Sequence, residues 1–277
     1  MKPYVWLDDK VILAKPGKFP FFDEGFLCGQ GLFETMRTYS GKVFLLEKHI
    51  RRLIGSCPTL DIKAPSSVLL KKAVEEVIKK NKLNSAYVRL NVYKKNKDVG
   101  IFVFAKDKKF YAKKDYDKGF SAAIIRDLRQ DEASPLAGVK SLNRYFYVLL
   151  GEMASNLGAD EAIILNSKGS ICEGSRSNIF TVKKGVIFTP PVDSGCLAWI
   201  TREVVIEIAG MLKLDLFQIA LKPSDLLSSD EAFATNSLIE VMPLTKVDAR
   251  IIGRGKIGSL TKLILEKYRS LVYGNYK

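Results

Sequence analysis

The spacing of apolar and polar residues in the first part of the chain predicts short strands, two helices and then further strands. "YVWLDDKVILA" and "LFETMRTYSGKVFLL" each predict two strands around a tight turn, the second at Ser40-Gly41. "EKHIRRLIGSC" and "SSVLLKKAVEEVIKKN" predict helices, and Ser66 or Ser67 can cap the second one. "AYVRLNVY", "GIFVFA" and "FSAAIIR" predict strands. This part is therefore expected to be α+β and to end near Asp117.

Strands and helices alternate again beyond a polar loop that runs from about Asp127 to Val139. "SLNRYFYVLLGEMASNLG" predicts a helix that ends at Gly158, and "EAIILNSKGSICEG" and "SNIFTVKKGVIFTP" predict hairpins. "ITREVVIEIAGML" and "KIGSLTKLILEKYRSLV" predict helices, with strands around "LDLFQIA" and "EAFATN" between them. The pattern predicts an α/β protein with two α+β lobes. We expect a small N-terminal α+β domain at 1–117, a connecting strand and interdomain loop at 118–138, and a larger domain at 139–277.

The charge and the composition narrow the possible partners. The formal charge is +14, but the lysines are scattered among acidic residues and no nucleic-acid motif accompanies them. We expect most of them to be solvated, and the excess charge to attract a small anionic substrate. No apolar run reaches the roughly 18–20 residues that span a bilayer, and the N-terminus lacks a signal peptide. The four cysteines form no CxxC pair, so we expect free thiols in the cytoplasm, with neither nucleic acid nor membrane as a partner.

Single residues decide little about the chemistry. Lys140 stands at the mouth of an amphipathic helix, where it is either one more solvated cation or an amine held for chemistry. The chain has one histidine, His49, and no GxSxG motif, so a Ser-His-Asp triad would depend on His49. A histidine-rich metal site is excluded by this count, and no metal is expected. Taken alone, Glu173 is a turn carboxylate and Arg52 a helix-surface cation.

Taken in order, several segments resemble the fold-type IV pyridoxal-phosphate enzymes, the class IV aminotransferase family. They are "DEGFLCGQGLFETMRTYSGKVFLLEKHIRRL", "VKSLNRY", "DEAIILNSKGSICEGSRSNIFTVKKGVIFTPP", "ITREVV" and "EAFATNSLIEVMPLTKVD". Together they cover nearly the whole chain at the spacing of the family. The resemblance implies a two-domain fold-type IV architecture, with pyridoxal 5'-phosphate bound by the C-terminal domain, and a homodimer.

The resemblance also assigns roles to particular residues. Lys140 matches the lysine that forms a Schiff base with the cofactor aldehyde and then moves protons. Glu173 matches the carboxylate that binds the pyridine nitrogen, and Tyr145 the tyrosine that meets the phenolic oxygen. The phosphate is expected at Arg52 and at three further positions, Ile200, Thr201 and Thr235. The first two of these three open a helix, whose free N–H groups favour an anion. Glu34 sits at the start of a strand that frames the pocket, with no assigned role.

The branch of the family is suggested by shorter features. Asn143 in "KSLN", together with "FETMR" and "TNSLIEVMPL", is similar to aminodeoxychorismate lyases. We therefore expect a pyridoxal-phosphate-dependent 4-amino-4-deoxychorismate lyase, which forms 4-aminobenzoate for folate biosynthesis and pyruvate through a Schiff-base intermediate. The alternative is an aminotransferase for branched-chain or other amino acids, of the L- or D-series. Against the D-series, the Arg-x-His pair of that branch is absent after "YVRLNVYKK". Candidate substrate-binding residues are Arg89, Lys94, Arg144 and Asn236. A basic scaffold protein without catalysis would require an idle cofactor site.

Overall fold

The computed structural model describes residues 3–14, 23–96 and 98–274. The chain forms two compact units, one of Met1–Lys109 with Val139–Arg144 and the other of Phe110–Gly138 with Tyr145–Lys277. These units are defined by contacts and not by independent folding. The domain boundaries predicted from the sequence therefore stay a prediction. In the described part of the chain, no helix is both long and apolar enough to cross a membrane.

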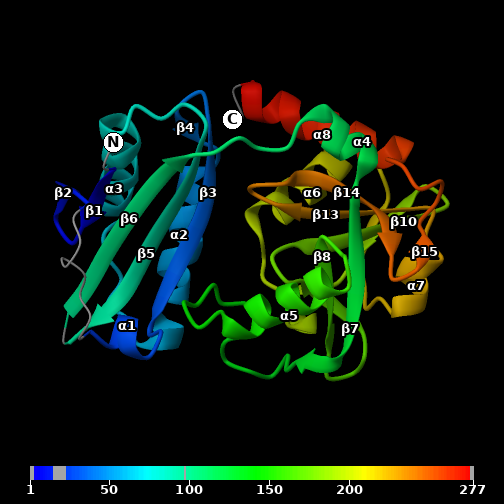
Figure 1. Cartoon of the computed structure of the whole chain (residues 1–277), viewed down its shortest axis with the longest axis horizontal. Coiled ribbons are helices and arrows are strands. Elements are labelled where there is room, and N and C mark those ends of the chain that lie inside the picture. The colour runs from blue at the N-terminus through cyan, green and yellow to red at the C-terminus, as the bar shows by residue number, and fades with distance from the viewer. Residues whose placement is uncertain (1–2, 15–22, 97, 275–277) are drawn as a thin grey trace. The chain divides into compact units, whose positions relative to one another are not determined.

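The first unit is a twisted sheet with its two longer helices, α2 and α3, on one face (Figure 1). The strand order is β2-β1-β6-β5-β3-β4, and every neighbouring pair is antiparallel. The strands are β1 (Tyr4–Leu7), β2 (Lys10–Leu13), β3 (Gly31–Tyr39), β4 (Lys42–Val43), β5 (Ala86–Lys95) and β6 (Asp98–Asp107). The helices are α1 (Glu24–Leu27), α2 (Leu46–Ser56) and α3 (Ser67–Lys80), with a 3₁₀ turn at Pro58–Leu60. α2 packs against β3, and α3 packs against β1 and β6.

Local chemistry explains why α3 forms where the sequence predicts it. The side chain of Ser66 accepts a hydrogen bond from the Leu69 N–H, and this satisfies one amide of the first turn. Apolar residues at helical spacing, among them Leu70, Val74 and Val77, are fully buried against the sheet. Each such side chain contributes roughly 1.5–3 kcal/mol by leaving water. The cap and the apolar face therefore specify the same helix.

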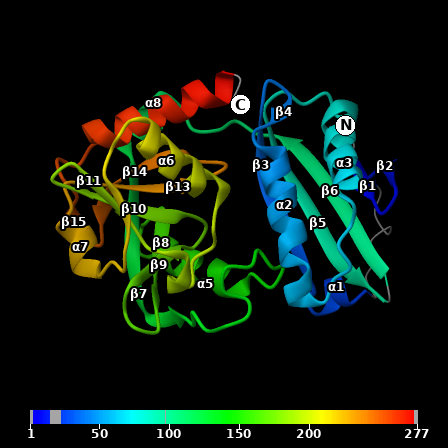
Figure 2. The same cartoon turned by 180° about the vertical axis from the view of Figure 1, so that it is seen from behind.

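The second unit contains a mixed sheet in the order β12-β11-β10-β13-β14-β7-β8-β9, with β15 paired to β14. β7 runs parallel to both of its neighbours. The strands are β7 (Phe120–Gln130), β8 (Glu161–Asn166), β9 (Ile171–Gly174), β10 (Asn178–Lys183), β11 (Val186–Thr189), β12 (Leu216–Gln218), β13 (Glu231–Asn236), β14 (Glu240–Val247) and β15 (Arg250–Ile251). The helices are α4 (Lys113–Lys118), α5 (Tyr145–Asn156), α6 (Ile200–Met211), α7 (Pro223–Leu227) and α8 (Ser259–Tyr273), with a 3₁₀ turn at Val192–Ser194. α5 packs on β7 and β8, whereas α6 and α8 pack on each other and against β13 (Figure 2).

The structure differs from the sequence prediction at the start of α5. The predicted helix began at Ser141, but Ser141 instead forms a β-bridge with Leu32. On either side, the Phe33 N–H donates to the Lys140 carbonyl at 2.9 Å, and the Leu142 N–H donates to the Gly31 carbonyl at 2.8 Å. These residues use their backbone groups on β3, so the helix cannot begin until Tyr145.

Strand β14 is absent from the sequence prediction. Pro243 lies inside it, and a proline normally argues against a central strand because it has no N–H to donate. Here Pro243 is paired in register with Phe233 of β13, and a register shift follows between Leu244 and Lys246 on the β7 side. The strand therefore forms around the proline.

Candidate active site

Lys140 is held by backbone pairing in the first unit. Its carbonyl accepts the Phe33 N–H, and its side chain is only 4% exposed. The Nζ atom lies 4.7 Å from the centre of the Phe33 ring. Lysine is among the residues least often buried, so a lysine in this position calls for a role beyond solvation. The geometry favours the second of the two readings of Lys140, an amine kept from solvent.

A buried ion pair lies next to this lysine in the same unit. Arg52 donates from Nε to Oε1 of Glu34 at 2.7 Å and from Nη2 to Oε2 at 2.6 Å, a bidentate pair. His49 Nδ1 lies 2.7 Å from Oε2. Because an ionised carboxylate only accepts hydrogen bonds, we assign the imidazole proton to Nδ1. The three side chains join strand β3 to helix α2.

The electrostatics of this group follow from its burial. Burial by itself would raise the pKa of Glu34, but the charge of Arg52 and the hydrogen bonds of Arg52 and His49 outweigh it and hold the pKa at about 2. Burial lowers the pKa of His49, and the positive charges of Arg52 and Lys140 lower it further. The negative charge of Glu34 raises this pKa, but by less than the other effects lower it. His49 is therefore neutral near pH 7, and the Glu34–Arg52 pair carries the charge.

Three cationic side chains surround the ring of Phe33. The guanidinium carbon of Arg89 lies 3.5 Å from the ring centre, Lys140 Nζ lies 4.7 Å away, and the guanidinium carbon of Arg144 lies 5.9 Å away. Two of the four candidate substrate-binding residues therefore lie at the same aromatic ring as the candidate Schiff-base lysine. Lys94 contacts Asp61 instead, at 3.4 Å. This arrangement suits a substrate that carries a carboxylate close to its reacting carbon.

In the second unit, Glu173 is fixed by the segment that leads into α6. Its side chain is 2% exposed, and its Oε2 accepts the Trp199 indole N–H at 3.0 Å and the Leu197 N–H at 3.1 Å. A buried carboxylate with two donors is suited to remain ionised. It can then face a protonated ring nitrogen, as the resemblance implies.

The start of α6 and strand β13 together suit a phosphate. Trp199 is the N-cap of α6 and provides no side-chain cap, so the first-turn amides of this helix are not capped by it. The helix packs against β13, where Thr235 is fully buried and its hydroxyl oxygen has no hydrogen-bond partner in the part of the chain that the structure describes. A buried hydroxyl without a partner calls for a ligand, and an anion at a helix N-terminus is the fitting one. Ile200, Thr201 and Thr235 therefore fit a bound phosphate group.

Two predicted residues have less support from the geometry. Tyr145 is the first residue of α5, and its side chain is 70% exposed. The amide of Asn236 is engaged in a turn: it donates to the Arg176 carbonyl and accepts the N–H groups of Leu238 and Ile239. The proposed substrate role of Asn236 thus rests on the resemblance alone.

Sequence reasoning missed two contributors, Trp199 and the pairing of His49 with Glu34. A tryptophan directly before a helix start is a signal that could have been used, because a buried indole N–H needs an acceptor. The pairing of His49 with Glu34 has no local signal, since the two residues are separated along the chain and meet only when α2 packs on β3.

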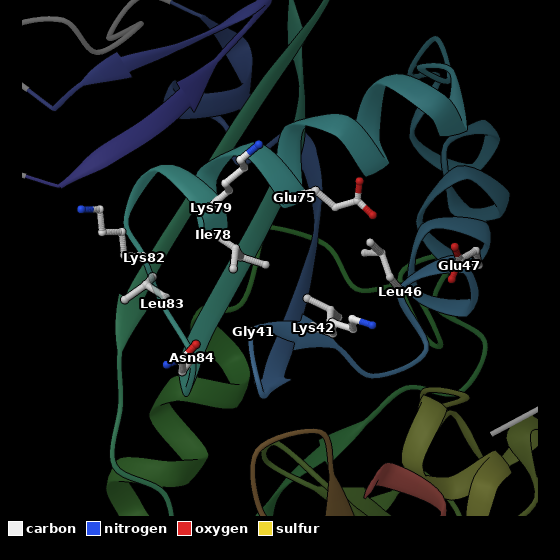
Figure 3. Close-up of a pocket in the computed structure, with 11 residues that line it drawn as sticks. Gly41, Lys42, Leu46, Glu47, Glu75, Ile78, Lys79, Lys82, Leu83 and Asn84 are labelled. Carbon is white, nitrogen blue, oxygen red and sulfur yellow. The ribbon is translucent and has the colours of Figure 1, made fainter. Parts of the chain in front are cut away.

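The first unit also contains a cavity of about 610 Å³. Figure 3 shows Lys42, Lys79 and Lys82 around apolar residues such as Ile78 and Leu83, between α2, α3 and the β3–β4 turn. None of the predicted site residues lines it. Among the residues that the structure describes, no group of three or more His, Cys, Asp or Glu could hold a metal ion.

Comparison with known proteins connects this geometry to a family. The family model for amino-transferase class IV matches residues 31–247. A Methanocaldococcus jannaschii protein with the provisional name branched-chain-amino-acid aminotransferase is 35% identical, and the alignment covers 96% of each chain. The D-alanine aminotransferase of Bacillus licheniformis is 31% identical over 87% of each chain.

A solved structure agrees with the fold. The branched-chain aminotransferase of Thermoproteus uzoniensis, crystallised with norvaline, is 30% identical and has a TM-score of 0.91, covering 100% of this chain and 97% of that one. The predicted mixed α/β architecture of fold-type IV enzymes is confirmed. These three proteins are all named as aminotransferases, so the comparisons do not support the predicted lyase activity. Short segments such as "KSLN" thus pointed to a narrower branch than the relatives support.

The cofactor prediction agrees with this family, whose members use pyridoxal phosphate. Matched by the family model at residues 31–247 and 35% identical to a relative over 96% of its length, the chain belongs to the class IV aminotransferases, a family of pyridoxal-phosphate enzymes.

Proposed function

We propose that this protein is an amino-acid aminotransferase whose amino donors are branched-chain amino acids. The observation that carries the proposal is that relatives named for transamination align with nearly the whole chain. The cations around Phe33 support it, because both an amino acid and a 2-oxo acid present a carboxylate beside the reacting carbon. The lyase reaction remains as an outcome that the test below can detect.

The proposed reaction gives a role to each of the main predicted site residues. Lys140 binds the cofactor through its amine and, once released, its Nζ removes the α-proton of the substrate and returns a proton to the product. Bound pyridoxal phosphate supplies an acceptor for the electron pair that this proton leaves behind. Glu173 keeps the ring nitrogen protonated, and Tyr145 donates to the phenolic oxygen. Arg89 and Arg144 orient the substrate carboxylates.

Four residues bind the cofactor phosphate in this proposal. The first-turn amides of Ile200 and Thr201 direct N–H groups to an anion at the start of α6. The Thr235 hydroxyl, which has no hydrogen-bond partner among the described residues, donates to a phosphate oxygen. Arg52 provides the positive charge, held in orientation by Glu34.

The cellular and quaternary setting is also part of the proposal. We propose a cytoplasmic homodimer in which the domains at 1–117 and 139–277 fold as separate bodies. Support comes from the family resemblance. Light scattering coupled to size-exclusion chromatography tests the dimer, since a monomer of 31.0 kDa would contradict it.

Product analysis tests the activity. Purified protein with pyridoxal phosphate receives 2-oxoglutarate and, in separate reactions, L-leucine, L-isoleucine, L-valine or D-alanine, and glutamate is quantified. In parallel, chorismate, glutamine and an aminodeoxychorismate synthase test for 4-aminobenzoate and pyruvate. The proposal predicts glutamate from the branched-chain L-amino acids, lost in Lys140→Ala. Equimolar 4-aminobenzoate and pyruvate in the lyase assay, with no glutamate formed in any of the 2-oxoglutarate reactions, would overturn it in favour of the lyase. Turnover of D-alanine alone would move the enzyme to the D-series.

A further inference from the structure

The hydrogen bonds of Trp199 connect two groups with different proposed tasks. Its indole N–H donates to Glu173 Oε2 at 3.0 Å, and its carbonyl accepts the Glu203 N–H in the first turn of α6. Its own N–H donates to the Leu197 carbonyl at 2.9 Å, and Leu197 in turn donates to the same oxygen of Glu173. One residue therefore contacts the candidate ring-nitrogen carboxylate with its side chain and begins the candidate phosphate helix with its backbone.

The burial of this group makes the indole bond consequential. Trp199 is 7% exposed and Glu173 is 2% exposed. In such surroundings a hydrogen bond to an ionised group is stronger than one between neutral groups, and its loss destabilises the charged form. An indole ring has few rotatable bonds and is packed here, so its N–H approaches the carboxylate from one direction.

We propose that Trp199 is a positioning residue for the cofactor: it orients Glu173 toward the ring nitrogen and fixes this carboxylate relative to the start of α6. The inference rests on the proposed cofactor site and adds a residue to it. In this proposal Trp199 acts through its hydrogen bond to Glu173. A substitution that removes the indole N–H but keeps an aromatic ring therefore separates positioning from simple packing.

The test replaces each of the two tryptophans of the chain by phenylalanine. Trp199→Phe removes the hydrogen bond to Glu173. Trp6→Phe is the matched control, because Trp6 is 1% exposed and its indole N–H donates to the Asp8 carbonyl at 2.9 Å. Both variants lose one buried indole bond, but only one loses a bond to Glu173.

Three readouts separate positioning from packing. Equilibrium titration of the cofactor-free protein is expected to show pyridoxal phosphate binding about tenfold weaker or more in Trp199→Phe, and unchanged in Trp6→Phe. The visible band of the bound cofactor changes when the nitrogen linked to Lys140 loses its proton. In Trp199→Phe this change is expected at a higher pH than in the wild type. A less effective carboxylate leaves less positive charge on the ring, so the nitrogen linked to Lys140 keeps its proton to higher pH. In Trp6→Phe, Trp199 is the one tryptophan left of the two in the sequence, so bound cofactor is expected to quench the fluorescence of Trp199.

A double-mutant cycle assigns the effect to Glu173. In a Glu173→Gln background, Trp199→Phe should weaken cofactor binding by less than about twofold further, because the charged partner is already gone. Equal effects of Trp199→Phe in both backgrounds, or an effect no larger than that of Trp6→Phe, would overturn the inference. If Trp199→Phe does not fold, benzothienylalanine at position 199 removes the N–H and keeps the bicyclic shape, and the same outcomes apply.

Failure of the cofactor site itself gives a different result. If wild-type protein shows no lysine-dependent visible band with pyridoxal phosphate, the proposed site fails before Trp199 is considered. If the band is present in wild type and lost in Lys140→Ala, while Trp199→Phe behaves as Trp6→Phe, only the role of Trp199 fails.

Discussion

Replacement of Glu34 by glutamine tests how the first unit holds Arg52. Glu34 is fully buried, and its pKa is about 2 against an ordinary value of 4.5. Each pKa unit corresponds to about 1.4 kcal/mol, so ionised Glu34 contributes about 3 kcal/mol to the free energy of unfolding. This agrees with the roughly 3–5 kcal/mol lost when one partner of a buried ion pair is removed. At pH 7, Glu34→Gln is expected to lower the free energy of unfolding by about this amount.

The direction of the pKa shift of Glu34 determines how its stabilising effect depends on pH. Because the folded-state pKa is depressed, the stabilisation is fully present above pH 4.5 and is lost as the pH falls toward 2. Urea denaturation of the cofactor-free wild type and of Glu34→Gln should therefore give curves that differ at pH 7 and converge between pH 4.5 and pH 2. Glu47→Gln is the control on the same helix. Glu47 pairs with Lys71 at the surface, and its loss should cost less than about 1 kcal/mol. A difference for Glu34→Gln that is constant with pH, or absent at pH 7, would refute this reasoning.

Two further substitutions test the phosphate and substrate residues. Thr235→Val should weaken pyridoxal phosphate binding about tenfold or more in an equilibrium titration, because the buried hydroxyl is expected to donate to a charged oxygen. Thr189→Val is its control: that hydroxyl already donates to the Ile179 carbonyl at 2.8 Å, so stability should fall while cofactor affinity stays the same. Equal cofactor affinity in both variants would contradict the assignment. Arg144→Leu should raise the KM for 2-oxoglutarate about tenfold or more with a smaller change in kcat, since a cation at the Phe33 ring is removed. An unchanged KM in steady-state assays would place Arg144 outside the substrate site.

Much of the secondary structure could be predicted because its causes are local. The serine cap and apolar spacing of α3, and the turn at Lys184-Gly185 between β10 and β11, depend on residues only a few positions apart. The family, the cofactor and the predicted Schiff-base lysine were inferred from ordered motifs rather than from any single residue. Substrate choice depends largely on loops, and three short segments, "KSLN", "FETMR" and "TNSLIEVMPL", favoured the lyase.

The sequence by itself determined which side chains are present and which helices and strands they favour locally. Tertiary structure decided that Ser141 pairs with Leu32 instead of starting a helix, and that Glu34 meets Arg52 and His49. It also decided that the indole of Trp199 reaches Glu173. These contacts join residues 15 to 109 positions apart, so no local pattern encodes them. They form because burial forces each polar group to find a partner wherever packing brings one within reach.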